Sequence, residues 1–161
     1  MTYTRDLFVF ASFTALSFVD IKELPTDDIV EINGEKWILS KRHKTKVNFQ
    51  VKLLGIPLQI IKRYERFQED KLVFPNLNYW NICKPLKKMI KECGISKDIS
   101  FHCTRHGFAT LALSKGVPIE SVSRVLGHTN ITTTQKYAKI TTGKIDKDLT
   151  MFGNRLNQSF S

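Results

Sequence analysis

Histidine, arginine and tyrosine residues recur at short distances in the second half of this 161-residue sequence, and their types suit chemistry on a phosphate group. The segment "HCTRH" places His102 three residues before Arg105 near the expected start of a helix, so both side chains project on one side. Free amides at a helix start favour an anion, and the planar arginine fork matches two phosphate oxygens. The pair predicts a phosphate clamp, although the motif alone is weak.

A second histidine and a tyrosine follow this clamp. "LGH" ends at His128, and Tyr137 comes nine residues later. A tyrosine hydroxyl, with a pKa near about 10, is a poor nucleophile at neutral pH, so it needs a base and nearby positive charge. Cationic donors fixed around a phosphorus act where negative charge develops. Upstream, "RHKTK" adds Lys44, which precedes the other four residues in the chain.

This order of residues resembles the catalytic domain of the tyrosine recombinases, the phage integrase family, over nearly the whole chain. The resemblance implies that Tyr137 attacks the scissile DNA phosphate, giving a 3′-phosphotyrosyl link and a free 5′-hydroxyl. It also implies that Arg105 and His128 contact the phosphate and that His102 accepts or relays the tyrosine proton. Lys44 would protonate the leaving 5′-oxygen. No cofactor and no metal ion is implied.

The first motif of that family departs from its usual form here. Family members carry a segment like "TGLRxxE" or "TGLRxxD", whereas "TALSFVD" puts Ser17 in place of the arginine and Ala15 in place of the glycine, with Asp20 as the acidic residue. The chain resembles integrases of Bacteroidetes conjugative transposons in "RDLFVFASFTALSFVD", and these also lack the arginine. Either another cation substitutes, with Arg42 as the candidate, or the site has decayed; the five intact residues favour the first alternative.

Charge indicates a polyanionic partner. Lys and Arg outnumber Asp and Glu by 25 to 15, giving a net charge of +10 and a pI near 9.6. The stretch 36–66 holds nine basic residues against the single acid Glu65. We expect double-stranded DNA at recombination sites as the partner, and the resemblance implies a tetramer of protomers on that DNA. The residues expected to contact DNA are Lys41, Arg42, Lys46 and Arg105.

Neither a membrane span nor a disulfide framework is indicated. No apolar run approaches the roughly 20 residues needed to cross a bilayer, and "MTYTRDLFVFASF" does not resemble a signal peptide. We therefore expect a cytoplasmic protein. The odd number and wide spacing of Cys83, Cys93 and Cys103 argue against disulfides and zinc and favour buried free thiols.

The periodicity predicts a mainly α fold with a small antiparallel β-sheet (α+β), and the resemblance implies the tyrosine recombinase catalytic-domain fold. The apolar stretch 5–16 indicates a buried helix, and 17–25 a short second one. Alternating residues at 47–54, with 31–33 and 36–40, predict three strands. Further helices are expected at 57–67, 79–93, 104–115 and 118–126, and then a short one, capped by Thr129 or Asn130, that carries Tyr137.

We expect residues 1–161 to form one catalytic domain and to be a fragment of a longer protein, because family members normally carry an N-terminal core-binding domain. The tail 140–161 carries apolar residues for a helix that packs at home or on a neighbouring protomer.

Two other functions stay open: a catalytically impaired DNA-binding accessory protein, and a type IB topoisomerase with the same nucleophile. His106 is expected to pack, and threonines 132–134 either contact phosphate or cover a helix face.

Overall fold

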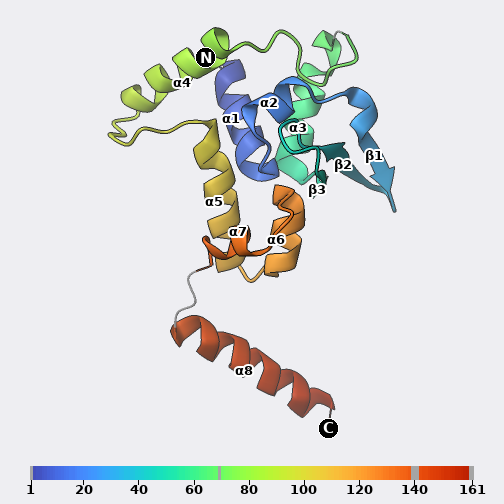
Figure 1. Cartoon of the computed structure of the whole chain (residues 1–161), viewed down its shortest axis with the longest axis vertical. Helices are drawn as coiled ribbons and strands as arrows, with labels where there is room; N and C mark the ends of the chain where they lie inside the picture. The colour runs from blue at the N-terminus through green and yellow to red at the C-terminus, as the bar shows by residue number, and fades with distance from the viewer. Residues whose placement is uncertain (1, 69, 139–141, 160–161) are drawn as a thin grey trace.

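The computed structural model describes residues 2–68, 70–138 and 142–159 (Figure 1). The elements are α1 (Thr2–Thr14), α2 (Phe18–Lys22), the 3₁₀ helix η1 (Thr26–Asp28), β1 (Ile29–Ile32), β2 (Glu35–Lys41), β3 (Asn48–Lys52), α3 (Gly55–Tyr64), the 3₁₀ helix η2 (Glu65–Phe67), α4 (Tyr79–Glu92), α5 (Phe101–Ser114), α6 (Ile119–Leu126), α7 (Thr132–Gln135) and α8 (Thr142–Ser159). The predicted fold class, mainly helical with a small antiparallel sheet, is confirmed.

The three strands form one antiparallel sheet in the order β1-β2-β3. Asn33 and Gly34, both at positive φ, make the tight turn between β1 and β2, as this residue pair favours in two-residue hairpins. On β3, Phe49 and Val51 are buried and Gln50 between them is exposed, so the predicted alternation is confirmed. The longer loop between β2 and β3 carries the lysines of the hairpin.

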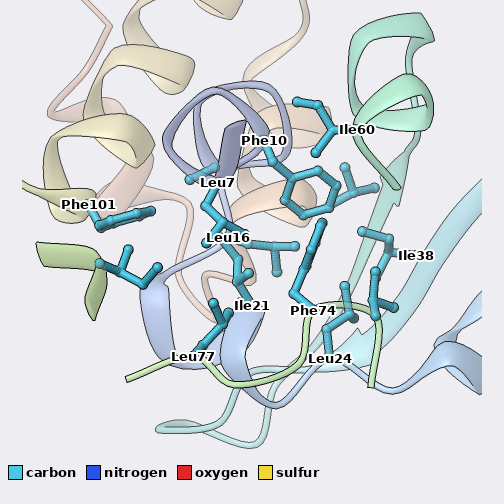
Figure 2. Packing of buried hydrophobic residues seen from close by; sticks show 14 of the residues in the cluster. Leu7, Phe10, Leu16, Ile21, Leu24, Ile38, Ile60, Phe74, Leu77 and Phe101 are labelled. Carbon is cyan, nitrogen blue, oxygen red and sulfur yellow. The ribbon is translucent and has the colours of Figure 1, made fainter. Parts of the chain in front are cut away.

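The main core forms around α1, which packs against α3, α4 and α5. Leu7 and Phe10 of this helix are almost wholly buried, and the ring of Phe10 meets that of Phe74 edge to face at 4.9 Å between centroids (Figure 2). Such burial explains why the 5–16 stretch is apolar on most sides. The end of α1 is thereby fixed close to α5, where it can position polar groups.

Two helix boundaries differ from the predictions in ways that affect the site. α5 begins at Phe101, with Ser100 as its N-cap, so His102 lies in the first turn of the helix instead of before it. α7 ends at Gln135, and Tyr137 therefore stands in a turn; the prediction that a helix carries Tyr137 is wrong. The Asn130 side chain does accept from the backbone N–H of Thr132, as a cap would.

The cysteines are less buried than expected. Cys93 and Cys103 are exposed and Cys83 is half-buried, so the expectation of buried thiols is wrong for the first two. Cys93 caps the C-terminus of α4, and Cys103 lies in the first turn of α5; both positions face solvent.

The last helix, α8, stands apart from the other elements in Figure 1. Four of its apolar side chains are exposed and recur at helical spacing, which places them on one face: Ile145, Leu149, Phe152 and Leu156. Among the described residues, no helix is long and apolar enough to cross a membrane.

Candidate active site

Arg105 is held between the ends of two helices. Its Nη1 donates to the carbonyl of Ala15, just after α1, at 2.8 Å, and its Nη2 donates to the carbonyl of Leu126, the last residue of α6, also at 2.8 Å. Ala15 is fully buried and adopts φ +55°, a conformation that favours glycine. Burial lowers the pKa of Arg105 below its usual value. The strained turn at Ala15 thus presents a carbonyl that fixes the arginine.

Ser17, which stands where the family has an arginine, caps α2. Its Oγ accepts from the backbone N–H of Asp20 at 3.2 Å and donates to Asp20 Oδ2 at 2.7 Å. The Asp20 carboxylate in turn accepts from the backbone N–H of Ser17, which completes a capping box. This position therefore contributes a helix cap and no positive charge.

Asp20 joins α2 to the β2–β3 hairpin. Its carboxylate accepts from Arg42 Nη1 at 2.8 Å and from the backbone N–H of His43 at 3.0 Å. Burial raises the pKa of Asp20, but the hydrogen bonds from His43, Ser17 and Arg42 outweigh it, so the pKa lies below its usual value. An ionised Asp20 consequently anchors the loop that carries Lys44.

Arg42 is almost fully buried, at 5% exposure, against three elements. Nη1 bonds Asp20, Nη2 donates to the carbonyl of Val125 at 2.6 Å, and the guanidinium lies 4.0 Å from the ring centroid of Phe49. Among the described residues its Nε has no hydrogen-bond partner. Burial, then the charge of Arg105, lowers the pKa of Arg42 to about 10.

Gly127 makes room for this arginine. The residue ends α6 in the left-handed conformation, at φ +62°, and a Cβ there would lie 2.9 Å from both Cγ and Nε of Arg42. The glycine of "LGH" is therefore required both for the backbone conformation and for the close approach of Arg42.

His128 follows Gly127 in the chain, and a contact with α7 fixes its ring. Its Nδ1 lies 2.9 Å from Oγ1 of Thr134 in α7, and its backbone N–H donates to the carbonyl of Ser123. Burial, then the charges of Arg105 and Arg42, lowers the pKa of His128 below its usual value. The structure thus places His128, which follows α6, near Arg105 of α5 and Arg42 of the β2–β3 loop.

Tyr137 reaches the same place from the turn after α7. Its backbone N–H donates to the carbonyl of Thr134 at 3.0 Å, and its ring meets that of His106 edge to face, at 4.7 Å between centroids. The charge of ionised Tyr137 would interact favourably with that of Arg105. His106 packs, as expected, but it packs on the candidate nucleophile.

His102 and Lys44 lie at the margin of this cluster. His102 is exposed one turn before Arg105 on α5, and Lys44 is exposed on the β2–β3 loop next to His43. Neither side chain makes a hydrogen bond with another described residue. Lys41 and Lys46 are exposed on the same hairpin, whereas Arg42 is turned inward. The structure therefore places Arg105 near Arg42, His128 and Tyr137, with His102 exposed on the helix of Arg105 and Lys44 exposed on the loop of Arg42.

Two features of the site were not predicted from the sequence. The sequence left open whether the threonines 132–134 contact phosphate or cover a helix face, and neither alternative included the contact between Thr134 and His128 that the fold shows. The close approach of Arg42 to Gly127 joins residues 85 positions apart, for which the sequence carries no local signal.

The chain is similar to known proteins in both sequence and fold. The sequence matches the family model described as "Phage integrase family" over residues 2–144. It is 46% identical to the tyrosine recombinase XerD of Listeria monocytogenes over 63 residues, covering 39% of this chain and 20% of that protein. It is 33% identical to the tyrosine recombinase XerA of Saccharolobus solfataricus over 108 residues, covering 67% of this chain and 32% of that protein. The chain thus spans about a fifth to a third of the length of these relatives.

Solved structures show the same fold. A XerH site-specific recombinase bound to a difH substrate has a TM-score of 0.71 and 23% identity, over 92% of this chain and 47% of that one. The Tn1549 transposon integrase in complex with a circular intermediate DNA has a TM-score of 0.74 and 17% identity, over 91% and 57%. This chain belongs to the phage integrase family and has the fold of a tyrosine recombinase catalytic domain.

Proposed function

We propose that this chain is the catalytic domain of a site-specific DNA recombinase or integrase, which cuts and rejoins double-stranded DNA in the integration or excision of a mobile element. One observation carries the proposal: Arg105 lies close enough to Arg42, His128 and Tyr137, which come from three other segments, to interact electrostatically with each of them. A buried cation is costly unless it is paired with an anion; Arg42 is paired with Asp20, whereas Arg105 donates, among the described residues, only to carbonyl groups, so a phosphate with a negative transition state fits Arg105.

The roles that the family resemblance gives these groups make up the reaction that we propose. The oxygen of Tyr137 forms a bond to phosphorus while the bond from phosphorus to the 5′-oxygen breaks. The tyrosine proton passes to His102, and Lys44 gives a proton to the leaving 5′-oxygen. Arg105 and His128 stabilise the charge on the non-bridging oxygens. The reverse reaction, with a new 5′-hydroxyl as nucleophile, rejoins the strand.

Arg42 supplies the positive charge that Ser17 does not. Its guanidinium is hydrogen-bonded to Asp20 and Val125, so it acts through its charge from beneath the phosphate site, close enough to lower the pKa of His128. In a site of low dielectric such a charge acts over several ångströms. The missing arginine, together with this substitute, supports the finer relationship to integrases of Bacteroidetes conjugative transposons.

The DNA partner is supported by the exposed lysines of the hairpin. Lys41 at the end of β2, and Lys44 and Lys46 on the loop that Asp20 holds against the site, all face solvent. Phosphate contacts by such lysines make binding strongly dependent on salt. We infer that the protein acts in the cytoplasm.

Assembly into a tetramer on two DNA sites is supported by α8. Its exposed apolar face has a counterpart in a pocket of about 580 Å³ beside Tyr137, lined among others by Leu113, Val117 and Ile119. A tail that leaves one protomer and fills this pocket on the next would cover both surfaces.

A nicked suicide duplex tests the proposal. Cleavage next to the nick releases a short fragment that diffuses away, so the covalent complex accumulates and is seen as a retarded band on a denaturing gel. A pool of duplexes with randomised central sequence removes the need to know the target site. We expect a band with the wild-type chain and none with Tyr137→Phe, although both bind DNA.

The second candidate function is a DNA-binding accessory protein that does not cut. It is favoured by the first-motif serine and by the commitment of Arg42 to protein partners. DNA binding without any covalent band would establish it. Relaxation of supercoiled plasmid without strand exchange would instead favour a type IB topoisomerase.

A further inference from the structure

Thr134 contacts two residues of the candidate site: His128, which follows α6, and Tyr137, which follows α7. Thr134 is fully buried, whereas Thr132 and Thr133 beside it are exposed. Its side chain contacts Nδ1 of His128 at 2.9 Å, and its carbonyl accepts from the backbone N–H of Tyr137 at 3.0 Å. One threonine therefore joins the catalytic histidine and the nucleophile, and the position of each depends on it.

The direction of the hydrogen bond to His128 can be derived from burial. A hydroxyl carries one proton to donate and two lone pairs to accept. Within the described part of the chain, the only partner of Oγ1 of Thr134 is Nδ1 of His128. If Nδ1–H were the donor, the threonine proton would be buried with no acceptor among the described residues, which carries the full desolvation penalty of that group. The hydroxyl therefore donates, and Nδ1 accepts.

The state of the imidazole follows from the same surroundings. Burial and the charges of Arg105 and Arg42 keep the pKa of His128 low, so the ring is neutral at neutral pH and carries one proton. With Nδ1 as acceptor, that proton is on Nε2. A ring in this tautomer can donate to a phosphate oxygen through Nε2 and has no free lone pair there to act as a base.

We propose that Thr134 is a positioning residue that holds His128 in the Nε2–H tautomer, so that His128 is a hydrogen-bond donor to the phosphate. The proposal rests on the proposed recombinase function for its consequence, but not for the tautomer itself. It follows that His102, and not His128, accepts the proton of Tyr137, because the only basic nitrogen of His128 is the one that contacts Thr134. It also explains why only the third threonine of the run faces inward.

Nitrogen-15 NMR of the imidazole rings tests the tautomer directly in the whole chain. The chain has four histidines, and His128→Gln identifies the signals of His128 by their loss. At neutral pH we expect an unprotonated Nδ1 and a protonated Nε2 in the wild type and in Thr134→Ser. In Thr134→Val, which keeps the shape and removes the hydroxyl, the two tautomers should mix. A protonated Nδ1 in the wild type, or an unchanged tautomer in Thr134→Val, overturns the proposal.

Single-turnover cleavage of the nicked duplex tests the consequence. We expect Thr134→Val to slow formation of the covalent complex by about tenfold or more, since histidines in the wrong tautomer lose much of their catalytic effect. The dissociation constant for DNA should stay unchanged, and Thr134→Ser should restore the rate. Thr133→Val, at the exposed neighbouring position, is the matched control and should react like the wild type.

The outcomes separate the two proposals. A Thr134→Val rate equal to that of Thr133→Val overturns the positioning role, even if the wild type cleaves DNA. A wild type that forms no covalent complex overturns the recombinase function, whereas the NMR result still decides the tautomer. Thermal unfolding of each variant distinguishes loss of the fold from loss of positioning, and Thr134→Ser provides the rescue.

Discussion

Arg42 and Arg105 donate to consecutive carbonyl groups at the C-terminus of α6. Arg42 Nη2 lies 2.6 Å from the carbonyl oxygen of Val125, and Arg105 Nη2 lies 2.8 Å from that of Leu126. A helix C-terminus carries partial negative charge and unpaired carbonyls, so it can hold two guanidinium groups that would otherwise repel each other. The end of α6 thereby fixes the spacing of the two buried cations from which the site is built.

The approach of Arg42 to Gly127 predicts the effect of an added methyl group. Gly127→Ala forces an alanine into the left-handed region and places its Cβ 2.9 Å from two atoms of Arg42, so Arg42 must shift. Gly94→Ala is the matched control, because Gly94 has φ +70° and open space around a Cβ. We expect Gly94→Ala to lower the free energy of unfolding by about 1–2 kcal/mol and Gly127→Ala to lower it by at least about 1 kcal/mol more. Equal losses in urea unfolding would contradict the close contact.

The strained turn after α1 predicts a difference between two buried alanines. Ala15→Gly relieves a positive φ but loses a buried methyl group, so we expect the free energy of unfolding to change by less than about 1 kcal/mol. Ala11→Gly, within α1 and equally buried, has no strain to relieve and should destabilise by about 1–2 kcal/mol. Chemical denaturation measures both. A loss at position 15 as large as that at position 11 would show that the turn is not strained.

The Asp20 carboxylate predicts a dependence of stability on acid pH. Because the pKa of Asp20 is lower in the fold than in the unfolded chain, its contribution is complete above the unfolded pKa of about 4 and is lost as pH falls through the folded pKa. Asp20→Asn leaves Arg42 buried without its carboxylate, so at neutral pH we expect a loss of about 3–5 kcal/mol. Below about pH 4 the difference from the wild type should shrink. Thermal unfolding across this pH range measures it.

The exposed Asp27 provides the control for this series. Asp27→Asn should follow the wild-type curve, because its side chain faces solvent in η1. If Asp20→Asn keeps a constant difference from the wild type down to the lowest pH, the anchoring role of the ionised carboxylate is contradicted.

Much of this fold was predictable because its patterns are local. The alternation at Phe49 and Val51 and the glycine stops of the helices each depend on neighbours in the chain, and each appears in the structure. The strand predicted at 31–33 is wrong at its end, because Asn33 and Gly34 form the turn after β1. The prediction extended the short helix α7 to Tyr137, two residues too far, because a helix of four residues shows little periodicity in the sequence. The prediction of buried cysteines followed from the average tendency of that residue type. Cys93 and Cys103 are exposed because they lie at a helix end and a helix start that face solvent.

The candidate site was also predictable only in part. The order and spacing of the motif residues indicated which side chains matter, and the fold brings Arg105, His128 and Tyr137 together. The burial of Arg42 was not predictable, because it depends on Asp20, Val125 and Gly127, which come from separate elements. Such long-range contacts leave no pattern in a single sequence.

The exposed position of Lys44 predicts a specific rescue. Lys44→Ala should slow cleavage of an ordinary duplex by about 100-fold, on the scale of losses from a missing general acid. A duplex whose scissile 5′-oxygen is replaced by sulfur has a leaving group that needs no protonation, since a thiol is far more acidic than an alcohol. We expect this substrate to restore the Lys44→Ala rate, whereas Arg105→Ala should remain slow on both. Lys46→Ala, on the same loop, is the comparison: it should weaken DNA binding, but sulfur should raise its cleavage rate no more than that of the wild type. Failure of sulfur to rescue would mean that Lys44 is not the acid.

The identity of the nucleophile can be decided among the four tyrosines of the chain. The hydroxyl of Tyr3 donates to the carbonyl of Pro75, and that of Tyr64 donates to Asp6. Burial, then the hydrogen bond to Asp6, raises the pKa of Tyr64 to about 12, which makes it a poorer nucleophile. Tyr79 lies at the start of α4 against Trp80, and only Tyr137 is placed beside Arg105.

Mass spectrometry of the trapped covalent complex tests this assignment most directly. After nuclease and protease digestion, we expect the nucleotide remnant on the peptide that contains Tyr137, linked through a 3′-phosphate to the tyrosine oxygen. Tyr137→Phe should yield no adduct, whereas Tyr79→Phe should yield the same adduct as the wild type. An adduct on another residue, or a chain that binds the duplex and never forms one, would contradict the recombinase account.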